Sequence, residues 1–338
     1  GARVEIRRSF ARQKENQRMH QKESQRIEEE ARSKGISARH ALREVNRHYE
    51  DQREIARRVR SLYEDAFTYY LSAIVYELNR EYNDAYIDLK RVQKLRPGVP
   101  CVEDDLLRMA KLSGLSDALK EWMDRFGRPP ALRKDTQEGE IFLFFGCGMA
   151  PGKGQIKISV PIPEVGFIGL ALPKYEPVPN PIAHAALYDD QGRFYGRTFV
   201  LTDLEALSIR SLEDRMPMLT LKQVLRAAIK GVVVKTARDQ GGWAGELAAN
   251  LYNIITEQAD LRSWQTLPQN IQVARIPLRA GHHELVFALY GKTGGKVQER
   301  PFSLDVRPGE KIFLNARTGA WDLVGFNVFQ LGPKAGDG

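Results

Sequence analysis

The chain has 338 residues, of which 42% are hydrophobic, and this is enough apolar material for two or three packed domains. No run approaches the roughly 18 consecutive apolar residues that a membrane-spanning helix needs. The formal net charge of +8 is concentrated at one end, because residues 1–60 contain 17 Lys and Arg against 10 Asp and Glu. The sequence given therefore excludes a helical membrane span and places its positive charge near the N-terminus.

The first 60 residues predict two long, solvated helices. This region is rich in Arg, Gln, Glu and Ala, contains no proline and has few apolar positions. Gly35 followed by Ser37 is the pattern expected where one helix ends at a glycine and the next begins at a serine N-cap. We therefore expect residues 13–60 to form a charged helical hairpin that stands clear of the body, with arms on the order of 45 Å long at about 1.5 Å per residue.

Two short segments indicate an internal helical repeat. ARVEIRR at residues 2–8 aligns with AYIDLKR at residues 85–91, with the same or a similar residue type at six of the seven positions. The offset exceeds one tetratricopeptide unit of about 34 residues by about 49, which we assign to the hairpin as an insertion in the array. The first segment matches the second helix of a repeat, so we expect a further helix upstream. The second segment lies in a tetratricopeptide frame, whose core positions are Tyr69, Ala73, Tyr76, Ala85, Leu89 and Pro97.

The remaining helical region predicts the end of the repeat array. Residues 101–127 carry an apolar stripe at helical spacing and are expected to form a helix pair that caps the array. The polar, proline-bearing stretch at residues 128–139 then predicts a linker. A TPR-like helical domain over residues 1–127 follows from these features.

The second half opens with FLFFGCGMAPGKGQIKISVP at residues 142–161, in which glycines and a lysine follow an apolar strand. A phosphate-binding loop needs Gly, four residues, Gly-Lys and then Ser or Thr at the start of a helix. Here Cys147 replaces the first glycine, Gly154 replaces the hydroxyl residue, and the next residues alternate as in a strand. We predict a turn or bulge between two strands, and no cofactor.

Further strands and helices alternate after this turn. Apolar and polar residues alternate over residues 166–173, 184–201, 270–278, 283–291 and 300–318, and helical patterns cover 203–216, 220–240 and 243–258. The predicted fold class is therefore α+β. A mixed α/β domain is expected over residues 140–269, and a small antiparallel β-sandwich over residues 270–330.

No catalytic or metal-binding constellation is present in the sequence. There is no Gly-x-Ser-x-Gly, no His-Glu-x-x-His and no Cys/His pair at metal-ligand spacing. Cys147 with His184 offers a thiol and a base, but a cysteine in an apolar strand is usually inert. His282 and His283 are adjacent, so on a strand they point to opposite faces.

Two further residue pairs have structural interpretations. Asp260 and Arg262 lie beside apolar residues and are expected to hold a domain junction. Cys101 and Cys147 lie 46 positions apart, fit no metal spacing, and are either separate thiols or one disulfide. The sequence thus predicts no catalytic, metal-binding or cofactor-binding residue.

Several segments, in this order, resemble a bacterial family of tetratricopeptide-repeat cell-envelope proteins with no assigned activity, many of them predicted lipoproteins. The segments are ARVEIRR, NDAYIDLKRVQKLRP, GEIFLFFGCGMAPGKGQIKISVPIP, DLRSWQTLPQNIQVARIPLRAGHHEL and VRPGEKIFLNART. The family's Gly-x-x-Pro-x-Lys element matches Gly148, Pro151 and Lys153. Its Arg-Ser-Trp-x-x-Leu-Pro element matches Arg262, Ser263, Trp264, Leu267 and Pro268. The resemblance covers most of the chain except the hairpin.

The resemblance implies a location and a class of function. We expect a non-enzymatic scaffold of the bacterial envelope, in the periplasm and associated with the outer membrane. From the residues themselves, we expect it to bind partner proteins through the TPR-like repeats and the protruding hairpin of residues 13–60. It would form a homo- or hetero-oligomer with protein partners, such as outer-membrane lipoproteins. A signal peptide and a lipid-attachment cysteine upstream would supply its only membrane anchor.

Two alternatives stay open. One is a cytoplasmic nucleic-acid-binding adaptor that uses the basic hairpin, although interleaved acids and the lack of aromatics argue against nucleic acid. The weaker one is an envelope hydrolase with an unrecognised site.

Overall fold

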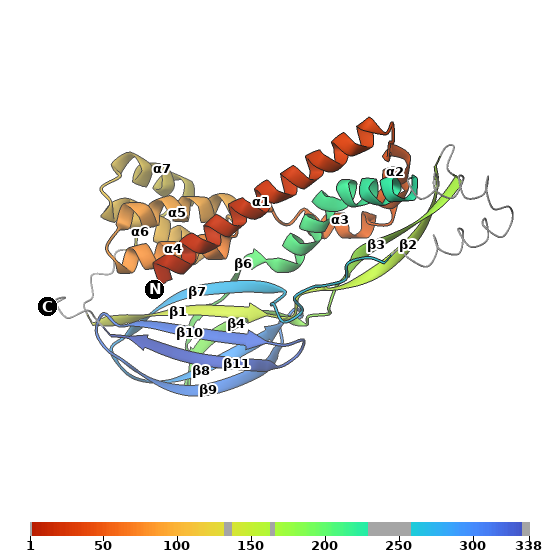
Figure 1. The fold of residues 1–338 in the computed structure, drawn as a ribbon. Helices are drawn as coiled ribbons and strands as arrows, with labels where there is room; N and C mark the ends of the chain where they lie inside the picture. Colours follow the sequence, from red (N-terminus) through yellow and green to blue (C-terminus); the bar gives the residue numbers. More distant parts are fainter. Residues whose placement is uncertain (1, 132–136, 163–165, 229–257, 333–338) are drawn as a thin grey trace, which may run out of the picture.

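The computed structural model describes residues 2–131, 137–162, 166–228 and 258–332. Helices come first and most strands follow, which confirms the predicted α+β class. Three layers form the body: a group of helices, a five-stranded sheet and a four-stranded sheet (Figure 1). A two-stranded hairpin with helices beside it extends from this body as an arm (Figure 1).

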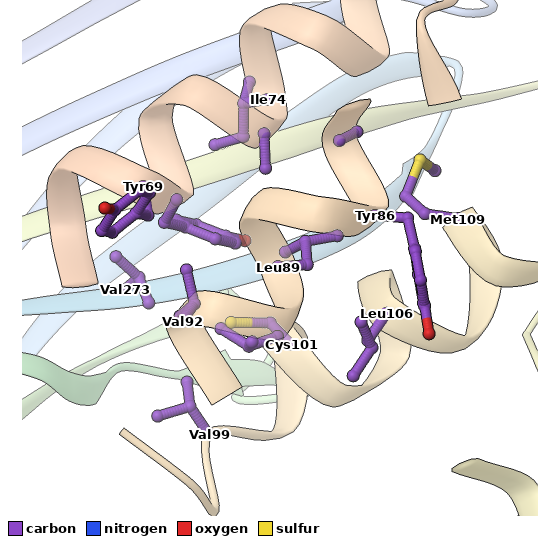
Figure 2. Close-up of a cluster of buried hydrophobic side chains, with 14 of the residues drawn as sticks. Tyr69, Ile74, Tyr86, Leu89, Val92, Val99, Cys101, Leu106, Met109 and Val273 are labelled. Carbon is purple, nitrogen blue, oxygen red and sulfur yellow. The ribbon is translucent and has the colours of Figure 1, made fainter. Parts of the chain in front are cut away.

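The helical layer consists of two consecutive helix pairs. They are α4 (Ala66–Leu78) with α5 (Tyr82–Leu95), and α6 (Pro100–Leu112) with α7 (Ser116–Phe126). Asp65 begins α4, since its carboxylate accepts hydrogen bonds from the backbone N–H groups of residues 67 and 68. Large and small side chains from these helices form one core against the five-stranded sheet (Figure 2).

The six repeat-frame positions lie in or next to this core. Tyr69 and Leu89 are buried in it, as Figure 2 shows, and so are the two small residues, Ala73 and Ala85. Tyr76 is only partly buried, with the Arg3 guanidinium 5.2 Å above its ring. Pro97 follows the end of α5.

The five-stranded sheet has the order β11-β10-β1-β7-β6. Its centre is β1 (Glu138–Cys147), which pairs in parallel with β10 (Lys311–Thr318) and antiparallel with β7 (Asn270–Arg279). The edges are β11 (Leu323–Leu331), which the sequence did not predict, and β6 (Phe199–Asp203). Both faces of β1 are buried: Ile141, Leu143 and Phe145 face the second sheet, whereas Phe142 packs against the helices.

The second sheet completes a β-sandwich. It has the order β5-β4-β8-β9, from β4 (Ile182–Asp189), β5 (Phe194–Arg197), β8 (Gly281–Gly291) and β9 (Lys296–Val306). The predicted sandwich of residues 270–330 alone is therefore wrong, because its two sheets also contain β1, β4, β5 and β6, and β1 pairs in parallel with β10. The strand β1 lies between β10 and β7, so the later strands cannot form their sheet without the earlier part of the chain.

The arm contains β2 (Gly152–Ile162) paired with β3 (Gly166–Glu176). Beside it lie α2 (Arg39–Arg47), α3 (Glu50–Ala56) and a helix over residues 204–228 (Figure 1). This helix runs through Pro217, where the sequence predicted a break, because apolar residues on both sides of the proline face the same core. The helix predicted at residues 243–258 lies almost entirely outside the described residues.

The charged region 13–60 differs from the expected free-standing hairpin. The first half of the region, up to Ser33, belongs to α1 (Ala2–Ser33). This helix starts beside the helical layer and extends to the arm that contains β2 and β3 (Figure 1). The second half of the region is split into α2 and α3. Ala41 and Val45 of α2, and Tyr49 just before α3, pack against β2 and β3. The Tyr49 hydroxyl also donates a hydrogen bond of 2.7 Å to the carbonyl of Pro173. Ala41, Val45 and Tyr49 are four positions apart and so form an apolar stripe. The many charged residues around them kept the stripe from being recognised in the sequence.

No helix within the described ranges is both long and apolar enough to cross a membrane.

Candidate functional site

The two sequence elements that carry the family resemblance meet where β1 ends and β2 begins. The backbone N–H of Ala150 donates to the carbonyl of Leu267 at 2.8 Å. The Lys153 ammonium donates to the carbonyl of Arg262 at 3.0 Å. We call residues 146–153 with residues 260–268 the motif junction. The structure therefore brings together two elements that lie about 110 residues apart, as the Lys153–Arg262 separation of 109 shows.

Gly148 fixes the course of the chain through the motif junction. Its φ of +69° lies in the left-handed region, which favours glycine. Its N–H donates to the hydroxyl of Thr318 at 2.9 Å, and a Cβ at this position would lie 2.5 Å from the Asn180 amide nitrogen. That amide in turn donates to the side chain of Gln269 at 2.8 Å. Four parts of the chain therefore meet at Gly148, and a side chain here would collide with one of them.

We expect Gly148→Ala to lower the free energy of unfolding by about 2–4 kcal/mol, from the cost of positive φ and the clash with Asn180. Gly127 is the matched control, since its φ is +66° and a Cβ there meets nothing within 4 Å. Gly127→Ala should cost only about 1 kcal/mol. Chemical denaturation of both variants measures the difference. Equal costs would show that the packing against Asn180 is not needed.

Arg317 joins the motif junction to β10, and sequence reasoning missed it. Its guanidinium donates to the carbonyls of Gly146, Gly148 and Thr318, and at 3.3 Å to that of Thr266. Burial lowers the pKa of Arg317. A single arginine in a strand gives no sequence signal for this role, because its carbonyl partners come from strand ends and loops that only the fold assembles.

Charged groups at the motif junction lie at its surface. Arg262 and Asp260 form an ion pair of 2.8 Å, and the hydrogen bonds from Arg262 hold the pKa of Asp260 well below its usual range. Burial lowers the pKa of Lys153, whose ammonium lies 5.5 Å from the centre of the Tyr175 ring. β1 ends at Cys147 and β2 begins at Gly152, so the predicted turn between two strands is confirmed, and Gly154 lies inside β2.

The outer side of the motif junction exposes large apolar side chains. Trp264 is 73% exposed, with its indole N–H donating to the hydroxyl of Thr266 at 2.5 Å. Leu261 and Leu267 are exposed on the same segment. Trp321, 61% exposed, lies in the loop after Thr318. We call Leu261, Trp264 and Leu267 the junction surface. Aromatic groups beside an arginine are typical of protein-binding surfaces.

The pairs considered as catalytic do not come together. Cys147 is buried in the sandwich core beside Asn180, whereas the His184 ring stacks on Tyr290 with centroids 5.2 Å apart. Burial raises the pKa of the Cys147 thiol, which disfavours the reactive thiolate. Cys101 is a free thiol in the helical core, so the open question of a disulfide with Cys147 is answered: the two do not pair.

The adjacent histidines have separate partners. His282 lies 2.7 Å from a carboxylate oxygen of Asp305 and 2.9 Å from one of Glu284, and these hydrogen bonds raise its pKa. The ring of His283 lies 2.7 Å from the carbonyl of Arg279. No group of three or more His, Cys, Asp or Glu suited to a metal occurs in the part of the chain that the structure describes.

A buried cluster of charged residues lies between the helices and the five-stranded sheet. No sequence motif predicts this cluster. Arg275 on β7 contacts Glu77 at 2.7 Å, Asp105 at 2.8 Å and also Glu140, and its guanidinium lies 4.5 Å from the Phe142 ring centre. Arg108 pairs with Glu77 and Asp105, and Lys311 pairs with Glu140 at 2.9 Å. These three basic and three acidic groups balance one another. The cluster is suited to holding two layers together.

The chain matches no protein-family model, no curated protein and no solved structure.

Proposed function

We propose that this chain is a non-enzymatic scaffold or assembly protein of the bacterial cell envelope, which binds partner proteins. The junction surface is the observation that carries this proposal. The loop that holds exposed Trp264 and Leu267 is anchored to the sandwich by hydrogen bonds from Arg317 to the carbonyl of Thr266 and from the N–H of Ala150 to the carbonyl of Leu267. The apolar side chains are thus presented on a supported loop. Rigid, exposed aromatic residues contribute strongly to protein binding when a partner covers them.

The helical layer supports a TPR-like interpretation of the N-terminal half. α4 with α5 and α6 with α7 follow each other as helix pairs, and the start of α1 packs beside α4. The rings of Phe10 and Tyr69 lie 4.6 Å apart, and Arg3 pairs with Glu81 at 2.6 Å. This contact of α1 with α4 supports the proposal that the start of α1 is the second helix of a repeat unit.

The long helix α1 offers a second surface for partners. Of its 32 residues only Ile27 and Ala31 are buried. A groove of about 530 Å³ lies between α1 and the helix over residues 204–228, with Met19 and Met218 among its lining residues. Methionine side chains adapt to varied apolar partners.

The envelope location and the lipoprotein partners rest on the family resemblance alone. For the alternative of nucleic-acid binding, α1 offers basic side chains, but Arg3 and Arg8 are paired with Glu81 and Glu5. A protein partner therefore remains the first proposal.

We expect Trp264→Ala to weaken partner binding at least tenfold, which is the loss typical of a central aromatic contact. The measurement is quantitative cross-linking of the purified protein to envelope extracts from the source bacterium, followed by titration of each captured protein. Met19→Ala, another exposed apolar residue, is the control for the junction surface. If Met19→Ala abolishes binding and Trp264→Ala does not, the groove beside α1 is the binding surface. If single-stranded nucleic acid competes for binding, the adaptor alternative gains support.

A further inference from the structure

The strand β11 forms an edge of the sandwich without the usual protection of an edge strand. Its sequence, LVGFNVFQL over Leu323–Leu331, contains no charged residue and no proline. It pairs with β10 on one side, and no described strand pairs with its other side. At its first residue, the N–H of Leu323 donates to the side chain of Gln298 at 3.0 Å. Backbone N–H and C=O groups along such an edge are available to another strand, which natural proteins usually prevent with charges, prolines or short strands.

The other edges of the sandwich follow that rule. β9, the edge of the second sheet, carries Lys296, Glu299, Arg300, Pro301 and Asp305. It lies next to β11, since the rings of Phe302 and Phe326 are 5.1 Å apart. β5 and β6 have only 4 and 5 residues. Within the described sandwich, β11 is therefore the long edge strand that lacks protection.

Side chains on β11 extend an apolar row of the sheet into solvent. Phe142 on β1 is opposite Phe313 on β10, and Phe313 is opposite Phe329 on β11. The first two rings stack with centroids 5.1 Å apart beneath the helical layer. Phe329 is 61% exposed, and Leu331 is also exposed. The row ends at a ring that a further strand would cover.

We propose that a second copy of this chain pairs with β11 in antiparallel orientation, with Asn327 of one copy opposite Asn327 of the other. This pairing joins two five-stranded sheets into one continuous sheet. It is independent of the proposed scaffold function, because no residue of the motif junction takes part.

The strand is complementary to itself about Asn327. Gly325, Asn327 and Phe329 share the face of Phe313, whereas Phe326 and Val328 face the sandwich core. In the proposed register, Phe329 of one copy covers Gly325 of the other, and Phe326 lies opposite Val328. Aromatic with β-branched pairs stabilise neighbouring strands, and an aromatic ring over glycine compensates for the missing side chain. The two Asn327 amides can donate to and accept from each other. A second copy therefore fits this edge better than an unrelated strand.

Sedimentation equilibrium of the full chain tests this proposal. At about 1–100 µM we expect a concentration-dependent mass that approaches twice 38.4 kDa. Phe329→Lys should raise the dimer dissociation constant at least tenfold. Each copy would then carry a positive charge on the strand that pairs with the other copy. Phe194→Lys is the matched control, since Phe194 is 54% exposed on the edge strand β5, and it should leave the dimer unchanged.

Cysteine cross-linking tests the register. Cys101 and Cys147 are both buried, so Asn327→Cys adds an exposed thiol on the proposed axis. Mild oxidation should convert most of Asn327→Cys into a covalent dimer, while Phe194→Cys should form the same dimer without a covalent link. A wild-type monomer at every concentration would overturn the proposal. A dimer that Phe329→Lys does not weaken, or that Asn327→Cys does not cross-link, would overturn the β11 pairing in this register.

Discussion

Replacing Arg275 with methionine is expected to lower the free energy of unfolding by about 3–5 kcal/mol, the range measured when one partner of a buried ion pair is removed. Methionine fills much of the same volume but leaves Glu77, Asp105 and Glu140 close together beneath the helices. Arg108 and Lys311 still contact these carboxylates, but they cannot replace the central guanidinium. Chemical denaturation at pH 7 measures the effect.

The pH dependence separates this electrostatic effect from a simple loss of packing. Burial raises the pKa of Glu77, but Arg275 and Arg108 outweigh it and lower the value to about 2. A carboxylate whose folded pKa lies below its unfolded value stabilises the protein above the unfolded value, and this contribution is lost as the pH falls towards 2. Without Arg275 the same carboxylate can take up a proton, so the stability gap between wild type and Arg275→Met should narrow from pH 7 to about pH 3.

The control for this variant is Arg262→Met, which removes an arginine from the exposed pair with Asp260. Exposed ion pairs contribute little, so its denaturation curve should stay close to that of wild type. A gap for Arg275→Met that is small, or that is the same at every pH, would show that the buried cluster does not hold the layers together.

Val45→Asp is expected to unfold the arm, at a cost of more than about 4 kcal/mol, because it places a carboxylate without a partner in an apolar core. Val45 is fully buried on α2, where it packs with residues of β2, β3 and the helix over 204–228. Limited proteolysis should then cut within residues 152–176, and the near-UV signal of Tyr49 should change. The sandwich should keep its protection, since its core is a separate cluster.

His40→Asp is the matched control, because it adds the same carboxylate at an exposed position of α2. It should leave proteolysis and thermal unfolding nearly unchanged. If Val45→Asp behaves in the same way, α2 is dispensable and the region 13–60 is a free-standing insertion after all.

Local patterns in the sequence were sufficient for most individual elements. The apolar run at residues 142–147 predicted β1, both of whose faces are buried. The alternation in residues 155–161, 270–278 and 283–291 predicted β2, β7 and β8, because one residue in two faces a buried layer. The stripe at residues 101–127 gave α6 and α7 for the equivalent helical reason. The rejection of a phosphate-binding loop likewise needed only the residues from Cys147 to Gly154 and the strand pattern after them. Each of these features is decided by contacts within a few positions of the chain.

The tertiary structure decided which distant segments meet. The parallel pairing of β1 with β10 joins residues about 170 positions apart, and no local pattern encodes such a pairing. No local pattern predicts the carbonyl partners of Arg317 or the three carboxylates around Arg275 either. A basic residue alone looks the same in sequence whether it lies in water or in a buried cluster. Only the packing of the layers removes water from it and so determines its partners.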